Sequence, residues 1–217
     1  MTIEENMAVL VPGATVSSGA VALLTRRRPK PGERRVQIMQ TLAAMLERPG
    51  GERVTTAALA AELDVSEAAL YRHFASKAQM LEGLIEFIEQ SVFVGVDEIL
   101  AREASPGDRA ARIVTTLMQF AEKNAGMARV MVGDALVYEN ERLQNRMNQF
   151  FDRIESTLGK ALQDDAAESG MPLSALDAQV RSGVLTSFVA GRLQRFTRSG
   201  FKRLPTEHLE LALERLV

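Results

Sequence analysis

The chain has 217 residues, 46% of them hydrophobic and 25% charged, which is the composition of an ordinary globular protein. It contains no cysteine and only two histidines, His73 and His208, which excludes disulfides, a thiolate nucleophile and metal sites built from cysteine or from several histidines. The net charge of −2 hides an asymmetry, because residues 26–77 hold ten Lys/Arg against six Asp/Glu. A local basic block of this kind is typical of a surface that meets nucleic acid.

The first 32 residues differ from the rest of the chain. Residues 7–24 carry no charge, but Glu4 and Glu5 precede them and three arginines follow, which is the reverse of a secretory signal. Proline and glycine within this stretch also disfavour a membrane helix. We therefore expect residues 1–32 to form a flexible extension with a basic arm and no membrane span. The arm, RRRPKPGERR at 26–35, is either a solvated tail or a segment that follows the DNA backbone or minor groove.

Nearly everything after residue 32 predicts helix. Apolar residues recur at helical spacing in 34–48, and short helices are expected at 56–63, after the possible caps Thr55 and Thr56, and at 67–74, after Ser66. Ser76 and Gln79 form a capping box that opens a long helix. Further helices are expected up to about residue 123, across 143–162, over about 174–199 and from 205 onward, with a turn at 124–126. No strand-like alternation occurs, so the sequence predicts an all-α protein.

Residues 33–76 predict a helix-turn-helix domain, whose second helix enters the major groove of DNA. Small alanines in the first turn of that helix allow close approach to a thymine methyl, and Glu67 can accept a hydrogen bond from a cytosine amine. Side chains nearby can donate to phosphates. The alternative is an ordinary helical pair in a bundle, with Tyr71 in the core as Phe74 is expected to be. The candidate DNA-binding residues are Thr55, Thr56, Ser66, Glu67, Ala68, Ala69, Tyr71, Arg72, His73 and Lys77.

Residues 77–217 predict a larger helical domain for dimerisation and partner binding. Met80, Phe87 and Val94 recur every seven residues, and they either pack against neighbouring helices or form an apolar partner surface. A stripe of small residues permits close helix packing, either across a two-fold dimer interface that the last helix completes or within the chain. Tryptophan is absent and tyrosine is scarce, which argues against a small-molecule pocket, although methionines can line one. The small residues of the stripe are Gly183, Ser187, Ala190 and Gly191.

Residues 54–81, VTTAALAAELDVSEAALYRHFASKAQML, resemble the N-terminal domain of the TetR family, with the L-Y-x-H-F-x-x-K pattern at 70–77. Residues 84–91, 123–155 and 195–206 resemble the nucleoid-occlusion members of that family. The resemblance implies a homodimer on double-stranded DNA that antagonises assembly of the tubulin-like division protein FtsZ, in the cytoplasm and on the nucleoid. It also implies FtsZ contacts at Phe87, Lys123 and Asn124. Gly95 departs from the pattern, because a basic residue is expected there.

Two functions remain in view: a DNA-bound regulator of division acting through FtsZ, and a ligand-released transcriptional repressor. The extended resemblance favours the first, whereas the helix-turn-helix alone is compatible with the second. An enzyme is disfavoured, since the chain has no cysteine and no glycine-rich phosphate loop, and no metal or cofactor is expected.

Overall fold

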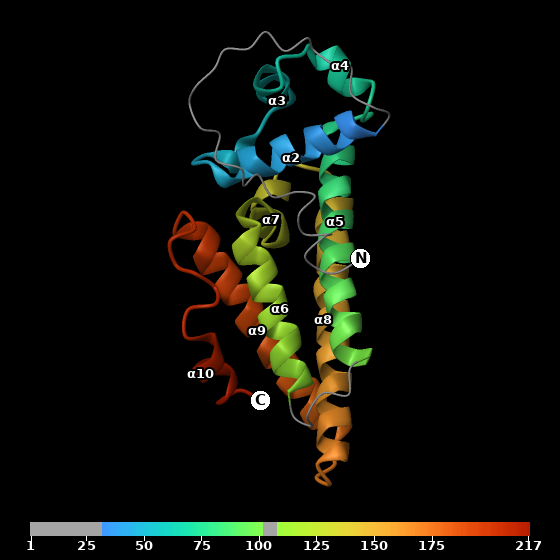
Figure 1. Ribbon diagram of the computed structural model, residues 1–217, viewed down its shortest axis with the longest axis vertical. Coiled ribbons are helices and arrows are strands. Elements are labelled where there is room, and N and C mark those ends of the chain that lie inside the picture. Colours follow the sequence, from blue (N-terminus) through green and yellow to red (C-terminus); the bar gives the residue numbers. More distant parts are fainter. Residues whose placement is uncertain (1–31, 102–107) are drawn as a thin grey trace, which may run out of the picture.

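The computed structural model describes residues 32–101 and 108–217, and these two ranges contain helices and no strand (Figure 1). The predicted all-α fold is confirmed. The proposed extension and arm fall almost wholly in residues 1–31, outside the described part of the chain. Within that part, no helix combines the length and the apolar character needed to span a bilayer. The elements, with η for 3-10 helices, are α2 (Glu33–Glu47), η1 (Gly51–Arg53), α3 (Thr56–Glu62), α4 (Glu67–Tyr71), α5 (Lys77–Ala101), α6 (Arg109–Lys123), α7 (Ala125–Met131), η2 (Asp134–Leu136), α8 (Glu141–Glu168), α9 (Ala175–Arg198) and α10 (Leu209–Leu213).

Three expected boundaries were wrong. Helix α4 ends at Tyr71 rather than at Phe74, and the last helix begins at Leu209 rather than near Pro205. The expected turn at 124–126 is limited to Asn124, which is followed at once by α7. Sequence reasoning took Gly126 for a turn residue, although it is a buried helical position.

Helices α2, α3 and α4 form the upper part of the molecule, where α2 lies across the ends of the long helices (Figure 1). Their shared core consists of apolar side chains that are almost fully buried, including Phe74 as expected. Ala60 is also buried, and its small side chain allows α3 to pack closely. The hydroxyl of Thr55 accepts a hydrogen bond from the Ala58 N–H at 3.1 Å and caps α3 as predicted. The core residues are Leu42, Leu46, Leu59, Leu70 and Phe74.

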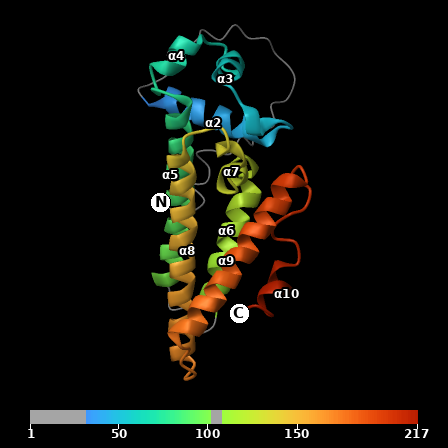
Figure 2. The same ribbon diagram turned by 180° about the vertical axis from the view of Figure 1, so that it is seen from behind.

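The long helices α5, α6, α8 and α9 form the body below. Figure 1 has α5 and α6 toward the viewer, whereas the reverse view in Figure 2 has α8 and α9 in front. Helix α8 packs most extensively against α9. Each fully buried leucine or isoleucine stabilises the fold by about 1.5–3 kcal/mol, so the apolar stripes of α5 and α8 account for much of the core. The buried residues of these stripes are Leu81, Leu84, Ile85, Ile88, Val92, Val96 and Ile99 in α5 and Leu143, Met147, Phe150, Ile154, Leu158 and Leu162 in α8.

Helix α7 joins the upper part to the body. A Cβ added to Gly126 would lie only 2.1 Å from the carbonyl oxygen of Ala43 in α2, so glycine is required for this contact. The Gly126 N–H also donates to the carboxylate of Glu47. The two helices therefore meet backbone to backbone.

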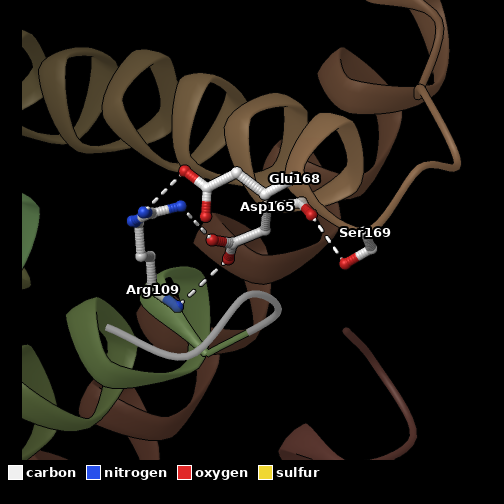
Figure 3. Close-up of polar contacts among 4 residues, drawn as sticks. All are labelled: Arg109, Asp165, Glu168 and Ser169. Atoms are coloured by element: carbon white, nitrogen blue, oxygen red, sulfur yellow. Dashed lines mark hydrogen bonds and ion pairs between the residues drawn. The ribbon is translucent and has the colours of Figure 1, made fainter. Parts of the chain in front are cut away.

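A partly buried charge cluster lies at the opposite end of the body (Figure 3). The guanidinium of Arg109 donates to Asp165 Oδ1 at 2.6 Å and to Glu168 Oε1 at 2.8 Å, and the Arg109 backbone N–H donates to Asp165 Oδ2 at 3.1 Å. These carboxylates, Glu168 first, raise the pKa of Arg109 above its usual value. The cluster fixes the start of α6 to the end of α8.

Candidate nucleic-acid interface

Helix α4 is short and points its polar side outward. Ser66, Glu67 and Ala68 are exposed, and Ala69 is half-buried above the buried Leu70. Tyr71 is 46% exposed, and Arg72 and His73 are also exposed, so none of the three is a core residue. Ser66 is the N-cap residue of α4 but makes no side-chain cap, contrary to expectation. Of the ten predicted DNA-binding residues, seven are therefore exposed, and Thr56, Ala69 and Lys77 are half-buried.

A hydrogen-bonded cluster joins the two helices of this motif. The hydroxyl of Thr56 donates to Glu67 Oε2 at 2.8 Å, and the Tyr71 hydroxyl donates to Thr56 Oγ1 at 3.4 Å. Thr56 thereby holds the Glu67 carboxylate in one position at the start of α4. A carboxylate fixed in this way can accept a hydrogen bond from a base without first losing side-chain freedom.

Two arginines that the sequence does not mark as DNA-binding residues hold the helix-turn-helix in place. Arg35 lies in α2, and Arg48 directly follows that helix. Arg35 donates to the His73 carbonyl oxygen at 2.7 Å, and its guanidinium lies 4.0 Å from the centre of the Phe74 ring. Arg48 makes a two-point ion pair with Glu62 in α3, with N–O distances of 2.7 and 3.0 Å. Through this hydrogen bond and its charge, Arg48 lowers the pKa of Glu62. Arg35 lies where the expected arm at 26–35 overlaps the helix predicted at 34–48, and the structure has it in α2.

Lys77 differs from the other predicted phosphate donors, because it is already paired. Its Nζ lies 2.8 Å from Glu139 Oε1, in the connection between η2 and α8. Beside this pair, the Arg53 guanidinium lies 5.9 Å from the ring centre of the exposed Tyr138. A phosphate would have to compete with Glu139 for Lys77. Neither Glu139 nor Tyr138 carries a sequence signal that places it here.

The predicted partner surface on α5 and α6 is partly corrected. Met80 is fully buried, and the half-buried Phe87 packs against Phe120, with ring centres 6.2 Å apart. Asn124 is only 6% exposed and donates its amide to the Phe120 carbonyl oxygen at 2.8 Å, so its side chain closes the end of α6 and is not available to a partner. Lys123 is exposed, and it remains accessible together with the outer edge of Phe87.

The small residues of α9 face outward rather than into the chain. Ser187, Ala190 and Gly191 are exposed, and a Cβ added to Gly191 would meet no atom within 4 Å. Gly183 is half-buried beside the carboxylate of Glu155. Three exposed apolar residues lie on the same side of α9. They are spaced four residues apart, which places them one above the other on the helix. They are Leu176, Val180 and Val184, and within the described residues nothing covers them.

A groove of about 840 Å³ lies on another side of the molecule, between α5, α6 and α10. Gly95, Thr116 and Gln119 are among its lining residues. Gln119 is one helical turn before Lys123 on α6, so the groove continues toward the predicted partner surface.

Two family descriptions match the sequence. The first, "Bacterial regulatory proteins, tetR family", matches residues 38–84, and the second, "Tetracyclin repressor-like, C-terminal domain" of the SlmA-like type, matches residues 108–216. A protein from Idiomarina loihiensis named nucleoid occlusion factor SlmA is 49% identical over 175 residues, which are 81% of this chain and 89% of that protein. The protein of the same name from Photobacterium profundum is 46% identical over 182 residues, which are 83% of this chain and 92% of that protein.

Solved structures of low identity share the fold. The fatty acid degradation regulator FadR from Bacillus halodurans superimposes with a TM-score of 0.68 at 16% identity, covering 87% of this chain and 96% of that one. The regulator FadR from Bacillus subtilis, solved with stearoyl-CoA, gives a TM-score of 0.65 at 15% identity, covering 83% and 96%. These two likenesses concern the arrangement of the helices alone.

Proposed function

Because the chain belongs to the TetR family, among the nucleoid occlusion factors named SlmA, we propose that it binds specific DNA sites and, while bound, restrains assembly of the division protein FtsZ over the nucleoid. The observation that carries this proposal is the extent of the similarity, which runs through residues 108–216 as well as the helix-turn-helix. A similarity limited to residues 38–84 would support DNA binding alone and would not indicate a function for the larger helical domain. Membership of this family also makes the chain a DNA-binding regulator rather than an enzyme.

DNA binding is assigned to a homodimer that places two α4 helices in successive major grooves of a pseudo-palindromic site. The exposed Glu67, Ala68 and Arg72 support this assignment, as does the Thr56 cluster that orients Glu67. Exposed apolar and small residues on α9, with Val184 near their centre, supply a surface for the two-fold contact. The protein would then reside in the cytoplasm on the nucleoid.

Contact with FtsZ is assigned to the outward side of α5 and α6. Phe87 offers an aromatic edge there, and Lys123 offers a charge at the end of α6. This side is opposite α8 and α9 in the two views (Figures 1 and 2), so a dimer built on α9 leaves it open. Asn124 takes no part in the contact beyond holding the end of α6.

A ligand-released repressor is the second candidate, and the groove favours it. A volume of about 840 Å³ falls within the range of ~300–1,000 Å³ that is usual for small-molecule sites. In that case a bound molecule would change the affinity for DNA, and FtsZ would have no role.

One experiment separates the two candidates. FtsZ is polymerised with GTP and sedimented in the presence of the protein, with and without a duplex selected by the protein from a random pool. We expect less FtsZ in the pellet only when protein and duplex are both present. Arg72→Ala should lose this effect together with DNA affinity, whereas Lys123→Glu should lose the effect and keep DNA affinity. Full sedimentation of FtsZ under all conditions would exclude the first candidate.

A further inference from the structure

The last two turns of α9 and the loop that follows them carry a dense group of positive charges. Arg192, Arg195 and Arg198 lie in the helix, and Lys202 and Arg203 lie in the loop. Cations at the end of a helix offset its dipole, which accounts for the arginines of the last turn alone. The two cations of the loop need another explanation. In Figure 1 this end of α9 lies below α2 at the left, away from α4 at the top.

Three of these guanidiniums line one small pocket. Three positive charges against the single carboxylate of Glu207 leave a net charge of two in the pocket while His208 is neutral. Across residues 32–101 and 108–217, the side chains of Arg195 and Arg203 make no ion pair and no hydrogen bond. The pocket therefore presents cations that the chain itself does not neutralise. Its volume is about 250 Å³, and its lining residues are Arg192, Arg195, Arg203, Leu204, Glu207 and His208.

The positive charges of the pocket also act against one another. Burial lowers the pKa of Arg192, and the like charge of Arg195 lowers it further. Arg192 is held beside its neighbour, because its Nη1 donates to the carbonyl oxygens of Pro205 at 2.8 Å and Glu207 at 2.7 Å. Like charges held side by side repel, and an anion between them would relieve the repulsion.

The loop that completes the pocket is held in one conformation. Ser199 Oγ accepts hydrogen bonds from the backbone N–H groups of Lys202 at 3.1 Å and Arg203 at 2.9 Å. Phe201 and His208 have φ angles of 65° and 53°, a left-handed conformation that residues other than glycine rarely adopt. Strained residues of this kind gather at binding sites, and a loop already in place needs little further ordering when a ligand binds.

Among anions, the arginines of the pocket favour phosphate. A guanidinium is planar and offers paired N–H donors that match two phosphate oxygens. Two guanidiniums are enough to hold one phosphate group, so three from two chain segments suit two adjacent groups. A volume of about 250 Å³ is below the ~300–1,000 Å³ that is usual for a whole small molecule, so the pocket has room for a diphosphate head alone. Leu204, which is 46% exposed, can cover an apolar part of the ligand that projects from the pocket.

We propose that this pocket binds the diphosphate group of a small soluble organic molecule, such as a nucleoside diphosphate. Arg195 and Arg203 hold the phosphates, and Arg192 adds its charge while it fixes the loop. A DNA duplex carries its phosphates along a convex surface, whereas a concave pocket of this size suits the free end of a smaller molecule. The inference does not rest on the proposed function, because the pocket includes neither α4 nor the outward side of α5 and α6.

The test titrates inorganic pyrophosphate into the full-length protein by isothermal titration calorimetry at physiological ionic strength. Wild type should bind one pyrophosphate per chain, at least about tenfold more tightly than sulfate, and its melting temperature should rise. ADP should displace the pyrophosphate. Arg195→Glu/Arg203→Glu reverses two charges of the pocket and should weaken pyrophosphate binding at least about tenfold. Arg198→Glu/Lys202→Glu is the matched control, because it changes the net charge equally at exposed neighbours that do not line the pocket, and it should stay within about threefold of wild type.

Should the pocket variant fold poorly, as judged by its melting temperature without ligand, Arg195→Gln/Arg203→Gln removes the charges without reversing them and should weaken binding in the same direction. Equal pyrophosphate binding by wild type and pocket variants overturns the inference, and so does pyrophosphate that ADP cannot displace. Vesicles of phosphatidylglycerol distinguish a lipid headgroup from a soluble ligand. Vesicle binding that the pocket variant loses, in a wild type that does not bind pyrophosphate, would assign these arginines to lipid and overturn the inference. Affinity for the selected duplex should stay within about twofold in the pocket variant, and a tenfold loss would assign the arginines to DNA instead.

Discussion

Lys77 and Glu139 are far apart in sequence, yet their charged atoms lie 2.8 Å apart. The lysine is the first residue of α5, and the glutamate belongs to the connection that leads into α8. Both side chains are partly shielded from solvent, with 26% and 13% exposed. One ion pair therefore ties the start of α5 to the connection before α8, and it uses a residue expected to hold a phosphate.

Glu139→Gln should strengthen DNA binding. Removing the competing carboxylate frees the Lys77 charge for a phosphate, so the affinity should rise about threefold and the slope of log K against log salt should steepen by up to ~0.9. Fluorescence anisotropy with the selected duplex at several salt concentrations measures both quantities. Glu141→Gln, in the next turn of the chain but unpaired with Lys77, serves as the control. Weaker DNA binding by Glu139→Gln would mean that the ion pair helps to position α4, and that Glu139 does not compete with a phosphate for Lys77.

Thr56→Val should reduce the preference for the selected DNA sequence more than it reduces the affinity for DNA of any sequence. Valine keeps the shape of threonine but cannot donate to Glu67 or accept from Tyr71, so the carboxylate loses its fixed position. Affinity for the selected duplex should fall about tenfold, as for one lost base contact, while affinity for a scrambled duplex stays within about twofold. Competition anisotropy compares the two duplexes, with Thr115→Val in α6 as the control. An equal loss on both duplexes would contradict the role given to Glu67.

Val184→Glu should separate the dimer. Val184 is 48% exposed at the centre of the α9 face, and a two-fold contact would bring two glutamates together without solvent. Light scattering after gel filtration should report a monomer, and affinity for a two-half-site duplex should fall at least about tenfold. Val137→Glu, at an exposed position away from this face, should stay dimeric. A dimer that survives Val184→Glu would place the interface elsewhere.

Glu62→Gln should remove an acid-sensitive part of the stability. Arg48 lowers the pKa of Glu62, so the ion pair contributes fully above the unfolded value of about 4.3 and its contribution is lost as the pH falls through the folded value. The melting temperature of the variant should therefore lie slightly below that of wild type at neutral pH. The two melting temperatures should converge at low pH, since a protonated glutamate resembles glutamine. A difference between the two melting temperatures that grows toward acid pH would contradict the role given to the Arg48–Glu62 ion pair.

The periodic elements could be predicted because their signals are local. The long helices α5 and α8 and the Thr55 cap depend on spacing of three or four residues, and the structure has them where the sequence predicts them. Gly126 misled the prediction because glycine is usual in turns, whereas here it permits contact between two helices. That requirement depends on Ala43, which no local pattern connects to it.

The exposed residues of the candidate site could be predicted from the sequence, but the distant residues that contact them could not. Tyr71, Arg72 and His73 are exposed, as a reading helix requires, and the motif alone indicates this. Glu139 beside Lys77, Arg35 beside His73 and the burial of Asn124 depend on how distant segments meet in space. The same holds for the groove, which is lined by residues of α5, α6 and α10.

The contact of Gly126 with Ala43 leaves no side-chain layer between α2 and α7 that could shear. In a dimer, the separation of the two reading helices would then be determined by the angle at which the two bodies cross. The length of the spacer between half-sites would be encoded in the residues of α9, far from any base. Changing the preferred spacer by one base pair would require repacking the dimer contact, whereas changing the preferred bases would require only new residues on α4.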